Sequence, residues 1–243
     1  MTARLTGLLG ASLFATLWPI APAVAGPPYE TDDPVPTDTG RWEVYTFTGL
    51  EGRGSNVEGS AGLDLNYGPI KDVQLTATLP MDYAHSRESG WRSGTGDLEI
   101  GVKYRFVTIP SAGISVAIFP RVFLPSSKAS TRTRVLLPVW AQKDMGKTSL
   151  FGGGGFEINP GPGNRDFWLA RAAVTNAISD TVTIGGEATH HSADTVGGAS
   201  SNSLGLGAIA KLRDPFSLLV AAGPAWSGGQ ASYHVYAALG LNF

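Results

Sequence analysis

The feature that most constrains this chain is an alternation of apolar and polar residues that recurs from about residue 41 to the last residue. In the final segment, "YHVYAALGLNF", residues 233 to 243, one set of alternate side chains is wholly apolar or aromatic, which is the period of a β-strand and not of a helix. The segments "DLEIGVKYRF" and "VQLTATLPMDY" alternate in the same way. Each has an apolar and a polar face over about ten residues, the length that a tilted strand needs to cross a bilayer.

Twelve such runs begin near residues 41, 59, 73, 95, 113, 133, 148, 166, 181, 203, 215 and 231. Short connections, such as "GPIKD" and "SDT", alternate with longer polar ones, such as "SADTVGGASSN". This pattern is typical of an outer-membrane barrel with both termini in the periplasm. A closed barrel also pairs the backbone amides that an open sheet would leave unpaired in hydrocarbon. We therefore predict an all-β fold, a transmembrane antiparallel up-and-down β-barrel of about 12 strands over residues 41–243, with a soluble β-sandwich as the alternative.

The residues before the first run divide into two parts. Residues 1–25 have a basic start, an apolar stretch and the small-residue sequence Ala-Val-Ala, which predicts a cleaved signal peptide; an uncleaved anchor is the alternative. Residues 26–40, "GPPYETDDPVPTDTG", hold four prolines and four acidic residues and cannot form a strand. This segment either hangs in the periplasm or folds into the lumen as a plug.

Composition narrows the function classes. A net charge of −2 gives no electrostatic case for a nucleic-acid partner. The absence of cysteine excludes disulfides, and it also excludes a lipoprotein anchor on a cysteine after the signal. No histidine, cysteine or carboxylate spacing predicts a metal site, and no sequence motif predicts a cofactor.

If the apolar faces meet lipid, the polar faces line the lumen, and the charged residues there are the candidates for a solute path. Parity along each run places seven acidic and six basic residues inside: Glu43, Asp64, Asp82, Asp97, Glu99, Lys103, Arg105, Arg121, Arg134, Glu157, Arg171, Glu187 and Lys211. Because neither sign dominates, we expect an electrostatically mixed interior. Inward aromatic residues would narrow the path and suit a flat apolar ligand, or else pack against residues 26–40; they are Tyr45, Phe47, Phe119, Phe123, Trp140 and Tyr236.

Hairpin register predicts cross-strand ion pairs, because paired residues have a constant index sum that the turn sets. Turns centred near 110, 145.5 and 179 place an acid opposite a base in three hairpins: Glu99 with Arg121, Arg134 with Glu157, and Arg171 with Glu187. Such pairs either guide a solute or simply neutralise charges in a narrow interior.

A hydrolase is the enzymatic alternative, since His85 with Ser86, and His190 and His191 with Ser192, fall at the outer ends of two runs. Neighbouring residues on a strand point to opposite faces, which argues against both a catalytic pair and a metal site there. We therefore expect no enzymatic activity.

The segment "GPPYETDDPVPTDTGRWEVYTF", with "LNYGPIKDVQLTATLPMDY", "GDLEIGVKYRF", "LPVWAQKDMG" and "GGGGFEINPGPGNRDFW", resembles the outer-membrane putative transporters of the meta-pathway phenol-degradation family. The resemblance implies a barrel associated with uptake of small, often aromatic, molecules, and it supplies no residue-level binding site. An apolar last strand that ends in Phe243 also resembles the signal that outer-membrane proteins present to the barrel assembly machinery.

The sequence thus predicts a monomeric barrel in the bacterial cell outer membrane that contacts membrane lipid. The barrel is predicted to pass small-molecule solutes, including aromatic or apolar ones. The alternative is a sealed-lumen structural barrel or an outer-membrane lipid hydrolase.

Overall fold

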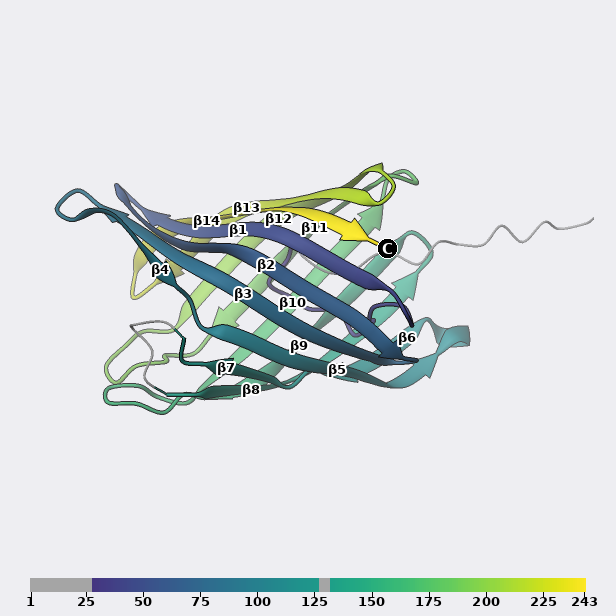
Figure 1. Cartoon of the computed structure of the whole chain (residues 1–243), viewed down its shortest axis with the longest axis horizontal. Helices are drawn as coiled ribbons and strands as arrows, with labels where there is room; N and C mark the ends of the chain where they lie inside the picture. Colours follow the sequence, from purple (N-terminus) through teal and green to yellow (C-terminus); the bar gives the residue numbers. More distant parts are fainter. Residues whose placement is uncertain (1–27, 127–131) are drawn as a thin grey trace, which may run out of the picture.

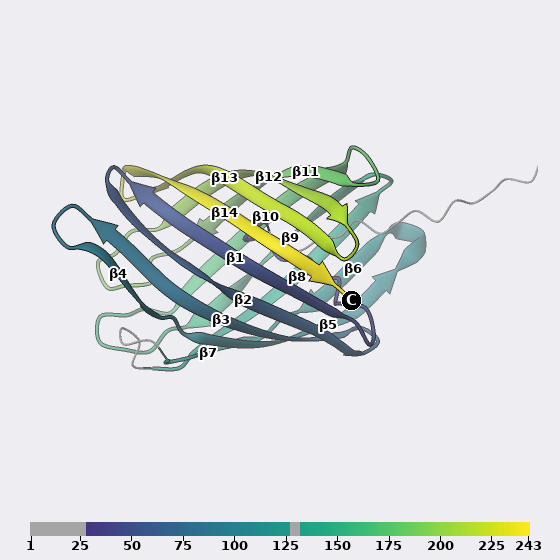
Figure 2. The ribbon, with the colours of Figure 1, turned by 45° about the horizontal axis from the view of Figure 1, so that its top comes forward.

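The protein is a closed antiparallel β-barrel in a computed structural model that describes residues 28–126 and 132–243 (Figures 1 and 2). The predicted signal peptide, residues 1–25, lies outside the described residues. The strands are β1 (Trp42–Arg53), β2 (Asn56–Ile70), β3 (Val73–Ser86), β4 (Gly90–Thr95), β5 (Leu98–Ile109), β6 (Ile114–Ile118), β7 (Arg121–Leu124), β8 (Arg134–Met145), β9 (Thr148–Ile158), β10 (Phe167–Ala177), β11 (Val182–His191), β12 (Ser201–Arg213), β13 (Phe216–Ser227) and β14 (Gln230–Asn242).

These segments make twelve barrel strands, because two strands are interrupted. β4 and β5 both pair with β3 and form one strand with a break after Thr95, while β6 and β7 both pair with β5 and β8 and form another with a break before Arg121. The barrel closes where β1 pairs with β14, from Glu43 opposite Asn242 to Gly52 opposite Tyr233. The predicted twelve-strand barrel is confirmed. Among the described residues, no helix is long and apolar enough to cross a membrane.

The two ends of the barrel differ in their connections. At the end that holds the start of β1 and the end of β14, the turns are short, as at 71–72, 146–147 and 214–215. We call this the periplasmic end, following the topology of outer-membrane barrels. At the other end, only the connections 125–133, 159–166 and 192–200 are long. The connections after β1, β3 and β13 belong to the set predicted to be longer, and this is wrong, because those strands extend to hairpin tips at 54–55, 87–89 and 228–229.

Side chains sort between the two faces as the alternation predicts. Outward residues such as Met81 and Trp168 are exposed to the surroundings, at 59% and 63%. Inward charged residues such as Lys103 and Glu157 are buried, both at 4% exposure. An apolar exterior around a charged interior is the arrangement that a bilayer imposes on a β-barrel, and it places the chain in the bacterial outer membrane.

The predicted hairpin registers are each wrong by two residues. Glu99 lies opposite Phe123, Glu157 opposite Leu136 and Glu187 opposite Ala173. In each case the turn is centred one residue later than predicted, so the parity of every side chain is unchanged. The residues predicted to lie directly opposite each other are therefore diagonal neighbours, and long side chains can still form an ion pair across that distance.

Candidate functional site: the lumen and the N-terminal segment

Residues 28–40, called the N-terminal segment below, lie inside the barrel near its periplasmic half. The segment leaves the barrel rim at Gly40, whose N–H donates to the carbonyl of Gly68 at 2.7 Å. It then crosses the lumen from the β2–β3 side to the β11–β12 side. Thr31 and Asp33 are completely buried along this path, at 0% exposure. The segment therefore fills space that the barrel wall alone would leave open.

Tyr29 anchors one end of the segment in an apolar pocket. Its ring is 8% exposed and meets Phe151 edge to face, with the ring centroids 6.3 Å apart. The pocket exists because two wall residues are glycines: an added Cβ at Gly185 would lie 2.7 Å from the Tyr29 hydroxyl, and one at Gly207 would lie 2.9 Å from its ring. Burial and the nearby charge of Glu187 raise the pKa of Tyr29 to about 12. Its hydroxyl has no hydrogen-bond partner among the described residues.

Glu187 on β11 binds the backbone of the segment beside this pocket. Its carboxylate accepts hydrogen bonds from the N–H groups of Glu30 and Thr31, at 3.2 and 3.1 Å, and from the Thr31 hydroxyl at 2.9 Å. Hydrogen bonds to an ionised acceptor are stronger than neutral ones. At the other end of the segment, the N–H and hydroxyl of Thr37 donate to the side-chain oxygen of Gln74.

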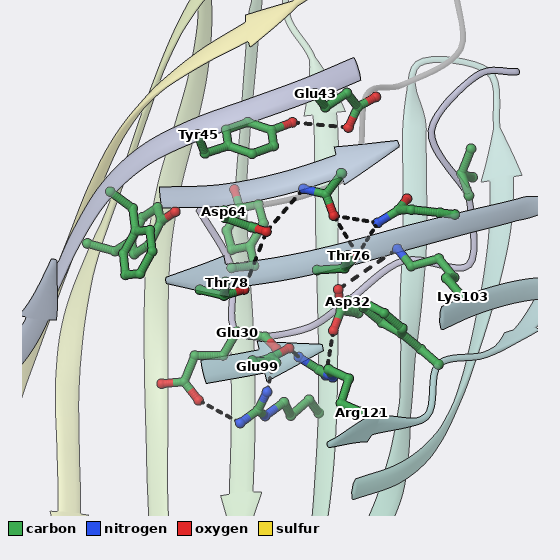
Figure 3. A pocket seen from close by; sticks show the side chains of 18 residues that line it. Glu30, Asp32, Glu43, Tyr45, Asp64, Thr76, Thr78, Glu99, Lys103 and Arg121 are labelled. Atoms are coloured by element: carbon green, nitrogen blue, oxygen red, sulfur yellow. Dashed lines mark hydrogen bonds and ion pairs between the residues drawn. The ribbon is translucent and has the colours of Figure 1, made fainter. Parts of the chain in front are cut away.

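Two carboxylates of the segment meet basic residues of the wall (Figure 3). Asp32 lies 2.8 Å from the Arg121 guanidinium and 3.9 Å from the Lys103 ammonium. Glu30 lies 3.2 Å from the Arg171 guanidinium, which also donates to the Glu30 carbonyl at 2.6 Å. The segment is thus held mainly by charge and backbone hydrogen bonds, with one aromatic anchor.

Asp33 is buried at the centre of the segment. One carboxylate oxygen accepts from the Val35 N–H at 2.6 Å, and the other has no hydrogen-bond partner among the described residues. Burial raises the pKa of the Asp33 carboxyl, against the opposing effect of the positive charge of Lys103. A raised pKa favours the neutral acid in the docked segment.

Three cavities surround the segment. The inner cavity has a volume of about 270 Å³ and is lined by the segment and by residues of β1–β3, β5, β7, β10 and β14. Two outer cavities, of about 790 and 770 Å³, lie on the extracellular side. The first is lined mainly by β1, β2 and β10–β14, and the second mainly by β3–β10. Arg171 lines all three cavities, and Arg121 lines the inner cavity and the 770 Å³ cavity.

The structure brings most predicted lumen residues to these cavities. The inner cavity is bordered by Glu43, Tyr45, Phe47, Asp64, Glu99, Lys103, Phe119, Arg121, Arg171 and Tyr236. The outer cavities add Asp82, Asp97, Phe123, Arg134, Glu157 and Glu187. Three predicted residues border none of the three: Arg105 pairs with Asp72 at 2.6 Å, Trp140 is completely buried, and Lys211 is exposed at the periplasmic end.

Two of the three predicted ion pairs are confirmed, as diagonal contacts. Arg121 lies 3.3 Å from Glu99, and Arg134 lies 2.6 Å from Glu157 and 3.7 Å from Asp97. The third is wrong in its partners. Arg171 binds Glu30 of the N-terminal segment, and Glu187 binds the backbone of that segment.

The inward aromatic residues support the basic ones and pack with wall residues. The guanidinium of Arg121 lies 4.6 Å from the centroid of Phe119, and that of Arg134 lies 4.5 Å from the centroid of Phe123. Phe119 and Trp140 belong to one buried cluster with Leu136, Phe167 and Leu169; Tyr45 belongs to another, against which Phe47 and Tyr236 pack. Arene faces stabilise a nearby cation, so this wall holds its charges in place.

In the hydrolase alternative, a serine hydroxyl would hydrogen-bond a histidine ring nitrogen, but the candidate histidine and serine residues have other partners. Ser192 Oγ accepts from the Trp168 N–H at 2.9 Å. The His191 ring packs against Phe167, and His190 Nδ1 bonds Asn202 Oδ1. His85 Nδ1 lies 3.3 Å from the Ser55 carbonyl.

Sequence reasoning missed the residues of the N-terminal segment as partners of the wall. A usable signal was present: Glu30 and Asp32 are two residues apart, so an extended segment presents both carboxylates to one side. Another was the pair of glycines in strand interiors, which marks a close approach by another part of the chain.

No protein-family model and no curated protein sequence matches this chain. Solved structures do match it in fold. The translocator domain of the autotransporter NalP from Neisseria meningitidis is 13% identical over 85% of this chain and 90% of that chain, with a TM-score of 0.57. The NanC porin is 11% identical over 82% and 98%, with a TM-score of 0.57. The KdgM porin is 8% identical over 83% and 99%, with a TM-score of 0.54. The chain shares the fold of outer-membrane porins and translocator barrels.

Proposed function

We propose that this protein is an outer-membrane channel for small organic solutes, and that its N-terminal segment is a plug that closes the lumen. The observation that carries the proposal is the contrast between the two sides of the segment. Outer cavities of about 790 and 770 Å³ lie on the extracellular side, whereas on the periplasmic side the interior is filled by buried residues such as Trp140 and Phe151. A solute can enter the barrel from outside and then meets the segment.

The fold likeness supports passage through the lumen. Two of the similar barrels are named porins, and a third is the translocator domain of an autotransporter; the KdgM structure holds a disordered oligogalacturonate. None of these names belongs to an enzyme, which favours a channel over the hydrolase alternative.

Aromatic solutes fit the lumen that we describe. Phe123 and Phe167 border the 770 Å³ cavity, and Phe47 and Tyr236 border the inner one, stacked with centroids 6.3 Å apart. Such rings offer faces for a flat solute. The resemblance of the sequence to the phenol-degradation transporters points the same way.

Ion conductance in a planar bilayer tests the proposal. The refolded chain without residues 1–25 is compared with a variant that also lacks residues 28–38, after both have been shown to be folded. We expect brief or no openings with the segment present and a steady current without it. A folded deletion variant that stays silent would contradict the channel and favour the sealed structural barrel.

The last strand supplies a second proposal, a partner in assembly. Phe243 is 56% exposed, and its backbone pairs with Trp42 at 2.8 and 3.0 Å, where the barrel closes. We expect deletion of Phe243 to slow assembly of the barrel into outer membranes while leaving spontaneous refolding in detergent unchanged. Equal loss in both assays would indicate a structural role in closure and no recognition by the assembly machinery.

A further inference from the structure

Two carboxylates of the N-terminal segment occupy basic positions that belong to the barrel wall. Asp32 lies 2.8 Å from Arg121, and Glu30 lies 3.2 Å from Arg171. The guanidinium group is planar and suited to binding carboxylates through parallel hydrogen bonds. The segment therefore presents to the wall the same chemistry that a small organic anion would present.

The wall holds Arg121 and Lys103 in place without help from the segment. Arg121 is fixed by Glu99 at 3.3 Å and by the face of Phe119 at 4.6 Å. The Lys103 ammonium lies 5.0 Å from the same ring. When the segment leaves, these two groups remain near their present positions, so the part of the site that binds Asp32 is preorganised for another carboxylate.

The same arginines can be reached from the extracellular side. Arg121 and Arg171 border both the inner cavity, which contains Glu30 and Asp32, and the outer cavity of about 770 Å³. A solute in the outer cavity thus meets the guanidinium groups on the side opposite the segment. Solute and segment compete for one set of cations.

We propose that Glu30 and Asp32 occupy the binding site of a small dicarboxylate solute, and that this solute opens the channel by displacing them. The inference rests on the proposed function. Glu30, Asp32, Arg121 and Arg171 all border the inner cavity, so a small diacid that enters it can reach both arginines. Because the rings of Phe47 and Tyr236 border the same cavity, a diacid built on a flat aromatic ring fits this position.

Binding of isophthalate (benzene-1,3-dicarboxylate), measured by calorimetry on detergent-refolded protein, tests the competition. The neutral diamide of the same ring is the matched ligand control. We expect isophthalate to bind the Glu30→Gln/Asp32→Asn variant at least about tenfold more tightly than the wild type, because the segment no longer fills the site. The variant that lacks residues 28–38 should bind at least as tightly, since its site is bare.

Wall variants locate the site. Adding Arg121→Gln and Arg171→Gln to the deletion variant should abolish binding. Arg105→Gln is the control: it removes an inward arginine that pairs with Asp72 at 2.6 Å and borders none of the three cavities, and it should leave the affinity unchanged. Equal affinity of wild type and deletion variant, equal binding of the diamide, or absence of binding to the deletion variant would each overturn the proposal.

Conductance separates this inference from the proposed function. A deletion variant that conducts but does not bind isophthalate would refute the dicarboxylate site and leave the channel intact. A deletion variant that binds isophthalate but carries no current would refute the channel and, with it, opening by displacement.

Discussion

Replacing Glu187 with glutamine should release the N-terminal segment, and the structure sets the size of the effect. The carboxylate accepts three hydrogen bonds from Glu30 and Thr31. An amide oxygen can keep the two from Thr31 as weaker neutral bonds, but its NH₂ group then faces the Glu30 N–H, donor against donor. Losing one charge-assisted bond and weakening two costs about 2 kcal/mol, or about a 30-fold higher ratio of released to docked segment.

A single cysteine reports this ratio, because the chain has no cysteine of its own. Asp33→Cys places a thiol at a position that is 0% exposed in the docked segment, and a water-soluble thiol reagent then modifies only the released form. In that background, Glu187→Gln should raise the modification rate about 30-fold over the unchanged residue. Glu157→Gln is the control: it removes another buried lumen carboxylate, which pairs with Arg134, and should not change the rate. A change below about threefold for Glu187→Gln would refute the role assigned to these hydrogen bonds.

Three other changes test the docking of the segment. Tyr29→Ala should destabilise docking of the segment by about 3 kcal/mol, because the buried ring is lost. Tyr29→Phe should leave docking as tight or make it tighter, since the hydroxyl has no partner among the described residues. The open probability of single channels measures both effects. Burial raises the pKa of Asp33 in the docked segment. The contribution of Asp33 to docking is therefore complete below the usual carboxyl pKa of about 3.9 and is lost as pH rises through the docked pKa. Conductance should rise from about pH 4 to 8, and Asp33→Asn should flatten that rise. Gly207→Val should expel the segment, because an added Cβ would lie 2.9 Å from the Tyr29 ring; Gly94→Val, where an added Cβ meets nothing within 4 Å, should leave conductance unchanged.

The barrel could be predicted from the sequence because lipid and lumen make opposite demands on alternate residues. That contrast fixes which face each side chain occupies, and Arg121, Glu99 and Arg134 accordingly lie inside. Register is a weaker signal, since a shift of two residues preserves every face. The turn at Gly146 shows what could have fixed it. A glycine at the first position of a two-residue hairpin loop, here at φ 66°, centres the turn between residues 146 and 147.

The N-terminal segment could not be placed from local pattern, because its contacts are made across the lumen. Glu187 contacts Thr31 over a sequence separation of 156, and no periodicity in a proline-rich stretch reports such a partner. The charges alone were ambiguous. Arg171 and Glu187 do not pair with each other. Each binds the N-terminal segment, and strand parity does not describe this competition between partners.

The N-terminal segment joins β1 at Gly40, so the segment is covalently attached to the barrel whose site it occupies. An intramolecular competitor on a short tether acts at an effective concentration in the millimolar range, whatever the abundance of the protein. A free solute that binds the wall no more tightly than the segment does must therefore reach comparable concentrations before it displaces the segment. In the channel that we propose, the short tether sets a threshold: the lumen stays shut against traces of such a solute and opens when the solute is plentiful.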